Sequence, residues 1–200
     1  MSDTQLDQRW RIDEIPKPVE QEAHNLYAII EPVIWPEWHA ELFADNQTPI
    51  YVPLFEGTPF NNIDNGPVVL CVSKKSNMLK LITTKLESSP CGSLFQSSSN
   101  TKMDDLLTTL RNALIVNTDR SSALMRYFEP RTLLPLVSTM TDAERSSVFR
   151  HTSQIQWFER QWFSVRISTV QELSEHHAWS LTPEHISTMQ SILTQWNGAA

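Results

Sequence analysis

The stretch LYAIIEP, residues 26–32, has the pattern of a short buried strand that ends in a glutamate and a proline. Aromatic and β-branched side chains favour a strand. Proline cannot donate a further ladder hydrogen bond, so we expect the strand to end near Glu31. A second stretch, RYFEPR at residues 126–131, closes an apolar run in the same way. Its charged residues are Arg126, Glu129 and Arg131. The repeated ending predicts charged side chains where strands leave a sheet.

Strand and helix patterns alternate along the first two-thirds of the chain. Strands are predicted at 26–30, 50–59, 68–73, 91–97 and 123–128. Pro53 places the second of them at a sheet edge or bulge. Helical patterns are found at 35–42, 78–86, 101–114 and 131–140. Ser76 is expected to cap the second helix, and Thr101 with Asp104 the third. The alternation predicts an α/β fold with a mixed β-sheet flanked by helices.

The last third of the chain is predicted to be mainly helical. Thr141 and Glu144 form a capping box, which opens a helix toward the aromatic cluster QWFERQWF at residues 156–163. Thr182 caps a final helix, with Pro183 at its first position. Its expected apolar face is Ile186, Met189, Leu193 and Trp196. The predicted organisation is an extended acidic lead-in at 1–25, an α/β core at 26–140 and a mainly helical C-terminal lobe at 141–200.

Composition excludes several classes of protein. No apolar run reaches the roughly 18–20 residues that a membrane helix needs, so membrane insertion is not expected. The polar N-terminus has no signal pattern, so a cytoplasmic location is expected. The net charge is −7, with ten acidic and three basic residues among the first fifty, which argues against nucleic-acid binding. Cys71 and Cys91 are too few for a disulfide framework and are expected to be free.

No catalytic constellation is visible in the sequence. The four glycines are too far apart for a phosphate-binding loop, and no serine has the Gly-x-Ser-x-Gly surroundings of a nucleophile. His176 and His177 are adjacent, but no cysteine or carboxylate stands at ligand spacing from them, so no metal or other cofactor is expected. Asp104 and Asp105 are explained by the start of a helix. We therefore expect a protein that is not an enzyme.

Five motifs in order resemble one known family. RYFEPRTLLPL resembles an Arg-Phe-Tyr-Asp-Pro-Arg-Val-Leu motif, and LYAIIEP a leading Tyr-Ala-Ile-Ile-Asp strand. PLFEGTP is similar to a Leu-Phe-x-Gly-Thr-Pro element, GPVVLCV to a Gly-Pro-x-Leu-Val strand, and CGSLFQSS to a Gly-x-x-Leu-x-Ser-Ser segment. The order and spacing agree over roughly residues 26–159. The family is that of bacterial type VI secretion adaptors, or effector chaperones, catalogued as domain of unknown function 4123.

The resemblance implies a role rather than a reaction. Such proteins act in the cytoplasm of Gram-negative bacteria, hold a toxic effector, often through its N-terminal or membrane-inserting segment, and help to place it on the spike protein of the secretion machine. Two other classes stay open: a small enzyme with a scattered active site, and a structural component of a larger assembly. An enzyme should show activity without a partner, whereas a structural component should copurify with the machine.

Two groups of residues are candidates for a site. The charged corner consists of Glu31, Arg126, Glu129 and Arg131, and both of its glutamates replace family aspartates. Glutamate is longer than aspartate, so each replacement moves the carboxylate by about one methylene group, which a catalytic carboxylate tolerates poorly. The corner is therefore interpreted as structural, with contact to the effector as the alternative. The second group is the candidate partner-binding group, although packing in the core is the commoner fate of such residues. Its members are Trp157, Phe158, Arg160, Trp162, Phe163, Trp179 and Trp196.

Overall fold

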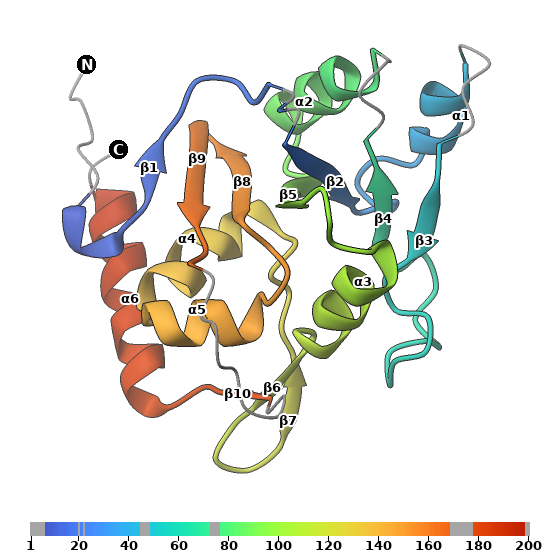
Figure 1. Ribbon diagram of the computed structural model, residues 1–200. Helices are drawn as coiled ribbons and strands as arrows, with labels where there is room; N and C mark the ends of the chain where they lie inside the picture. Colours follow the sequence, from blue (N-terminus) through green and yellow to red (C-terminus); the bar gives the residue numbers. More distant parts are fainter. Residues whose placement is uncertain are drawn as a thin grey trace.

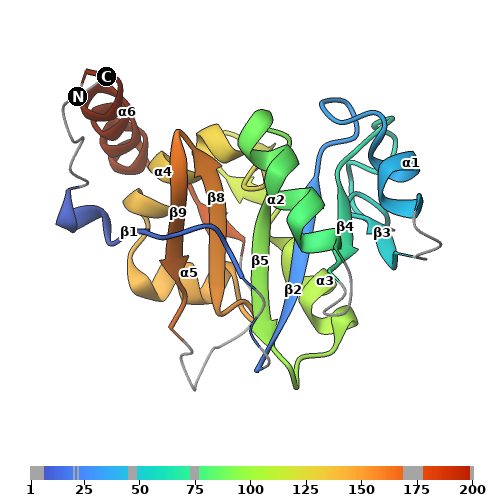
Figure 2. The same cartoon turned by 90° about the horizontal axis from the view of Figure 1, so that it is seen from above.

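A seven-stranded antiparallel sheet runs through the middle of the molecule (Figures 1 and 2). The computed structural model describes residues 7–19, 21, 23–44, 49–72, 77–168 and 178–198. The strand order is β1-β9-β8-β5-β2-β4-β3, and all neighbouring pairs are antiparallel. The strands are β1 (Asp13–Glu14), β2 (His24–Ile30), β3 (Tyr51–Pro53), β4 (Val68–Cys71), β5 (Gly92–Ser98), β8 (Gln154–Glu159) and β9 (Gln161–Arg166).

Helices cover both faces of this sheet. The first face packs against the apolar sides of α3 (Met103–Asn112), α4 (Pro130–Thr139), α5 (Asp142–Val148) and α6 (Pro183–Gly198). The second face is covered by α1 (Trp38–Phe43) and α2 (Met78–Ser88). A short 3₁₀ helix, η1 (Gln8–Trp10), adds Trp10 to the first face. These three layers confirm the predicted α/β fold with a helical C-terminal element.

The central strand β2 is apolar on both faces, because both faces are covered. Tyr27 and Ile29 lie in the core on the α3–α4 side, whereas Ala28 and Ile30 lie in the core on the α1–α2 side. Its neighbour β5 begins at Gly92, opposite Ile30. A Cβ atom at Gly92 would lie 2.0 Å from the carbonyl oxygen of Ile29, so only glycine fits where these two backbones meet.

A second, smaller sheet lies below the first in Figure 1. It has the order β10-β6-β7, with β10 (Trp179–Ser180) parallel and β7 (Ser122–Leu124) antiparallel to β6 (Ile115–Asn117). The strand predicted at 123–128 is therefore short and ends at Leu124. Residues 125–129 instead form a turn that leads into α4.

The aromatic cluster at residues 156–163 lies on a β-hairpin and not on a helix. Helix α5 ends at Val148, and β8 and β9 follow as neighbouring antiparallel strands. This hairpin joins the main sheet next to β5, so residues 154–166 extend the sheet of the predicted core. The division of the chain at residues 25 and 140 stays a prediction.

Two predicted helix starts are present in the structure, whereas one helix start and one helix face differ from the prediction. The capping box of Thr141 and Glu144 is present at the start of α5, and the Thr182 hydroxyl accepts a hydrogen bond from the His185 backbone N–H at the start of α6. Helix α3, however, begins after Lys102, without a side-chain cap from Thr101. In α6 the buried residues are Ile192 and Trp196, whereas Ile186 and Leu193 are exposed.

Some predictions fall outside the described residues. Ser76, His176 and His177 belong to this group. Cys71 and Cys91 are both free, as expected, and burial raises the pKa of each thiol. Burial disfavours the thiolate, so neither cysteine has the features of a reactive nucleophile.

Candidate partner-binding surfaces

The charged corner is assembled at the N-terminal end of α4. The Arg126 Nη2 donates a hydrogen bond of 2.6 Å to Oε2 of Glu31. The Arg126 Nε lies 3.4 Å from Oε2 of Glu129, and the Arg131 Nη2 donates to Oε1 of Glu129 at 2.6 Å. Two arginines and two glutamates therefore form one continuous chain of ion pairs.

The corner has a buried and an exposed layer. The side chains of Glu31 and Glu129 are only 10% and 12% exposed, whereas those of Arg126 and Arg131 are 49% and 62% exposed. Burial raises the pKa of Glu31, attraction to Arg126 opposes that shift, and repulsion from Glu129 adds to it. The carboxylates thus lie beneath the arginines and hold them in place.

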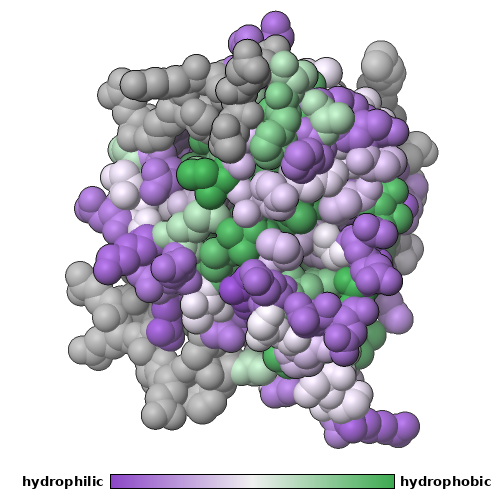
Figure 3. Space-filling model, turned by 90° about the vertical axis from the view of Figure 1, so that its right-hand side faces the viewer, coloured by the Kyte–Doolittle hydropathy of each residue, from purple (hydrophilic) through white to green (hydrophobic). Residues whose placement is uncertain are grey.

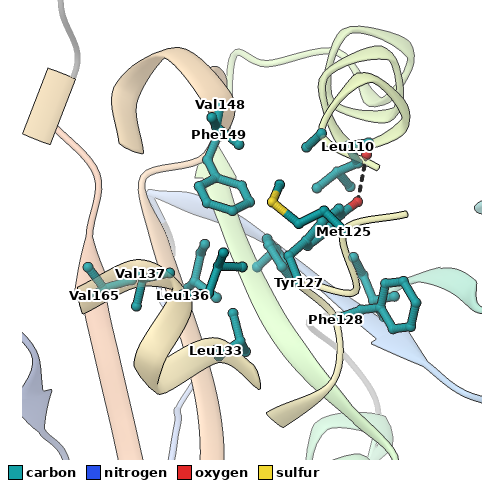
Figure 4. Close-up of a cluster of buried hydrophobic side chains, with 14 of the residues drawn as sticks. Leu110, Met125, Tyr127, Phe128, Leu133, Leu136, Val137, Val148, Phe149 and Val165 are labelled. Atoms are coloured by element: carbon teal, nitrogen blue, oxygen red, sulfur yellow. Dashed lines mark hydrogen bonds between the residues drawn. The ribbon is translucent and has the colours of Figure 1, made fainter. Parts of the chain in front are cut away.

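The turn that carries the corner is anchored in the core. Figure 4 shows Tyr127 and Phe128 pointing into the apolar layer between the sheet and the helices. The Tyr127 hydroxyl donates a 2.7 Å hydrogen bond to the carbonyl oxygen of Leu110 on α3 (Figure 4). The Thr132 hydroxyl donates to the carbonyl oxygens of Arg126 and Glu129. This anchoring gives the corner a fixed geometry.

The tentative partner-binding aromatics are mostly buried in the core. Trp157, Phe163, Trp162, Trp179 and Trp196 all have less than a tenth of their surface exposed. Three of the indole N–H groups donate to buried or half-buried carboxylates: Trp162 to Glu87, Trp179 to Glu144 and Trp196 to Glu159. Phe158 is half-buried and Arg160 is exposed. The arrangement is that of core packing, so five of these seven residues offer little surface to a partner.

The hairpin tip and the charged corner lie at the same end of the sheet. Strands β2 and β8 run in the same direction on either side of β5, so Glu31, which follows β2, and Glu159, the last residue of β8, lie at this end. Burial raises the pKa of Glu159, while the Trp196 hydrogen bond and the charges of Arg160 and Arg131 oppose the shift. The charge of Arg131 therefore favours the ionised form of both Glu31 and Glu159.

An exposed apolar face lies at the opposite side of the sheet. We call it the α1–β3 face, and it consists of His39, Phe43 and Tyr51. His39 is exposed, Phe43 is half-buried and Tyr51 is 38% exposed. The rings of His39 and Phe43 stack at 4.0 Å on one side of α1, and Tyr51 packs edge-on against both. β3 is the outermost strand of the sheet here.

A groove of about 340 Å³ lies on the other side of α1, between α1 and α2. Its apolar part comes from Leu42, Met78 and Leu81, and its polar part from Glu41, Asn77, Lys80 and Thr84. Figure 3 shows this side of the molecule, where hydrophobic side chains gather near the middle of a largely hydrophilic surface. The groove and the α1–β3 face together make the apolar surface that the sequence did not single out. Pro53 was the available signal, because it marks an edge strand.

Neither a metal-ligand cluster nor a membrane-spanning helix is found among the described residues. Among them, no three histidine, cysteine or carboxylate side chains are grouped as metal ligands would be. Within the same ranges, no helix has the length and apolar character to cross a membrane.

Comparison with known proteins assigns the family. The model of DUF4123, a domain of unknown function, matches residues 26–147, which is more than half of the chain. The chain belongs to this family, which is associated with adaptors for type VI secretion effectors. No curated protein and no solved structure gives a significant match. The matched region contains most of β2, the charged corner and the α1–β3 face, and it ends before the β8–β9 hairpin.

Proposed function

We propose that this protein is a cytoplasmic, non-catalytic adaptor that binds a type VI secretion effector and helps to load it onto the spike protein. The observation that supports this function is the α1–β3 face, an aromatic surface at a sheet edge in a chain of an adaptor-associated family. Exposed apolar patches mark interaction sites. The membership of the family supplies the class of partner.

The α1–β3 face fits an apolar segment of an effector better than the C-terminal third does. The aromatic side chains of the hairpin are already used in the core, and opening them to a partner would remove them from the sheet. The α1–β3 face is open, and the neighbouring groove offers apolar walls with polar rims. A segment destined for a membrane needs such a surface to shield it from water.

Truncation of residues 141–200 is an unsuitable test of this function. The truncation removes β8 and β9, including the buried Trp157 and Phe163, from the middle of the main sheet. Loss of folding is the expected result, and it would hide any loss of binding.

The test is co-expression of the full chain with the product of the gene downstream of its own, followed by size-exclusion chromatography. We expect a stable complex, and we expect Tyr51→Asp to lower recovery of that product at least about tenfold, because it places a charge in the apolar contact. Ile186→Asp is the matched control, because Ile186 is exposed to a similar degree but lies on α6. Unchanged recovery with Tyr51→Asp would contradict the assignment of this face. Turnover of a small molecule by the purified chain alone would contradict the adaptor function.

A further inference from the structure

Three arginines surround the end of the sheet where β2 and β8 finish. Arg126 and Arg131 share Glu129, and Arg160 lies over the ring of Trp196, which donates its N–H to Glu159 at the same end of the sheet. We call these three residues the arginine rim. All three are exposed, whereas the carboxylates below them are buried or half-buried.

The structure holds the rim in a fixed geometry. The Arg126 guanidinium lies 5.7 Å from the centre of the Phe128 ring, and that of Arg160 lies 5.0 Å from the Trp196 ring. Cation–π contacts and ion pairs restrict the side chains before any partner arrives. Since the ordering is already present in the free protein, less entropy is lost on binding.

The outward surface of the rim is positive. Arg126 uses Nη2 and Nε toward glutamates, and Arg131 uses Nη2, which leaves other N–H donors on each exposed guanidinium. The N-terminal end of the α4 dipole lies at the same place, and the Glu129 side chain makes no capping hydrogen bond there. The positive layer thus faces solvent and the negative layer faces the core.

We propose that the arginine rim is a docking surface for an acidic segment of a partner protein, in which carboxylates receive hydrogen bonds from Arg126, Arg131 and Arg160. Guanidinium groups match carboxylates in a two-pronged geometry. A nucleic acid is a poorer occupant, because it presents a long row of phosphates, whereas the rim offers only three arginines, which suit a short acidic segment. This surface is separate from the α1–β3 face, so either one can fail without the other.

The test measures binding of a fluorescein-labelled oligoglutamate peptide by anisotropy, with an oligoglutamine peptide for comparison. We expect binding of the glutamate peptide only, weakening as salt is raised. The double variant Arg131→Gln/Arg160→Gln is expected to bind about tenfold more weakly. Glutamine at 131 keeps a donor for Glu129, and a melting curve checks that the variant is folded. Arg120→Gln is the matched control, because Arg120 is an exposed arginine in the β6–β7 turn.

A second measurement does not depend on variants. Modification of arginines by phenylglyoxal, read by mass spectrometry, should slow at Arg131 and Arg160 when the glutamate peptide is bound, and should not change at Arg120. Equal loss of affinity in the Arg120→Gln variant, or equal binding of both peptides, would overturn the proposal. Tighter binding of a DNA duplex than of the peptide would also overturn it. So would dimerisation of the free protein that the double variant abolishes, because the occupant would then be a second copy.

Discussion

The β8–β9 hairpin and the α1–β3 face are both rich in aromatic residues, but they use them in opposite ways. In the hairpin, Trp157 and Phe163 are completely buried, and the tryptophan beyond its tip, Trp162, donates its N–H to Glu87. On the α1–β3 face, Phe43 and Tyr51 pack against one another and remain accessible. The difference teaches that aromatic density in a sequence does not identify a binding surface. The position of a strand in the sheet decides whether its aromatic side chains are buried or accessible, since β8 lies inside the sheet and β3 lies at its edge.

The largest expected difference between the two regions is in stability. Trp157→Ala should lower the free energy of unfolding by about 3–5 kcal/mol, because it leaves a large cavity in the core. Tyr51→Ala should cost only about 1 kcal/mol or less, because Tyr51 is partly exposed at a sheet edge. Chemical denaturation of both variants measures the two values. Equal losses would mean that the α1–β3 face is part of the core in solution.

A smaller effect is expected within the charged corner. Arg126→Ala removes the cation above Glu31 and leaves that carboxylate buried beside Glu129, which should cost about 1–2 kcal/mol, less than for a fully buried pair because Arg126 is half-exposed. Arg131→Ala should cost about 0.5 kcal/mol or less, because its side chain is mostly exposed. Denaturation curves measure the loss of unfolding free energy in each variant. A larger loss for Arg131→Ala than for Arg126→Ala would mean that Arg131 is the main structural support of the corner.

The smallest effect concerns the pH dependence at the hairpin tip. Burial raises the pKa of Glu159 above its ordinary 4.5, so the ionised form carries a cost in the folded state at neutral pH. As the pH falls through the raised pKa toward 4.5, protonation removes that cost and this group adds stability. Glu159→Gln removes the charge and keeps an oxygen for the Trp196 N–H.

The comparison of wild type with Glu159→Gln isolates this group from the others that titrate. At neutral pH we expect the variant to be as stable as the wild type or more stable by about 1 kcal/mol or less. Below the ordinary glutamate pKa the advantage should vanish. Thermal melting across this pH range measures it. An advantage that grows on acidification would mean that the ionised carboxylate stabilises the tip.

The strands that the sequence predicted well are those whose composition is strongly β-forming. LYAII became β2 and VVLC became β4, since β-branched runs bounded by proline or glycine have few alternatives. The hairpin at 154–166 was missed for a physical reason. Trp157 and Phe163 enter the core on one face of the sheet and Trp162 on the other, so the two-residue alternation is hidden.

Its turn was equally hard to recognise. The residue at the tip is Arg160, which adopts a left-handed φ of 67° without the glycine or asparagine that usually marks such a turn. For the candidate site, the sequence did not show which arginine pairs with Glu31, because that depends on the turn that carries Arg126. Nor did it show the α1–β3 face, because exposure at a sheet edge depends on strand order, which no local pattern encodes.

The direct test of where the effector binds is amide hydrogen exchange on the full chain, free and in the copurified effector complex. The proposed function predicts that exchange slows in α1, β3 and the start of α2, while β8 and β9 exchange alike in both states. Slower exchange confined to residues 154–166 and α6, with no change in α1 and β3, would contradict it.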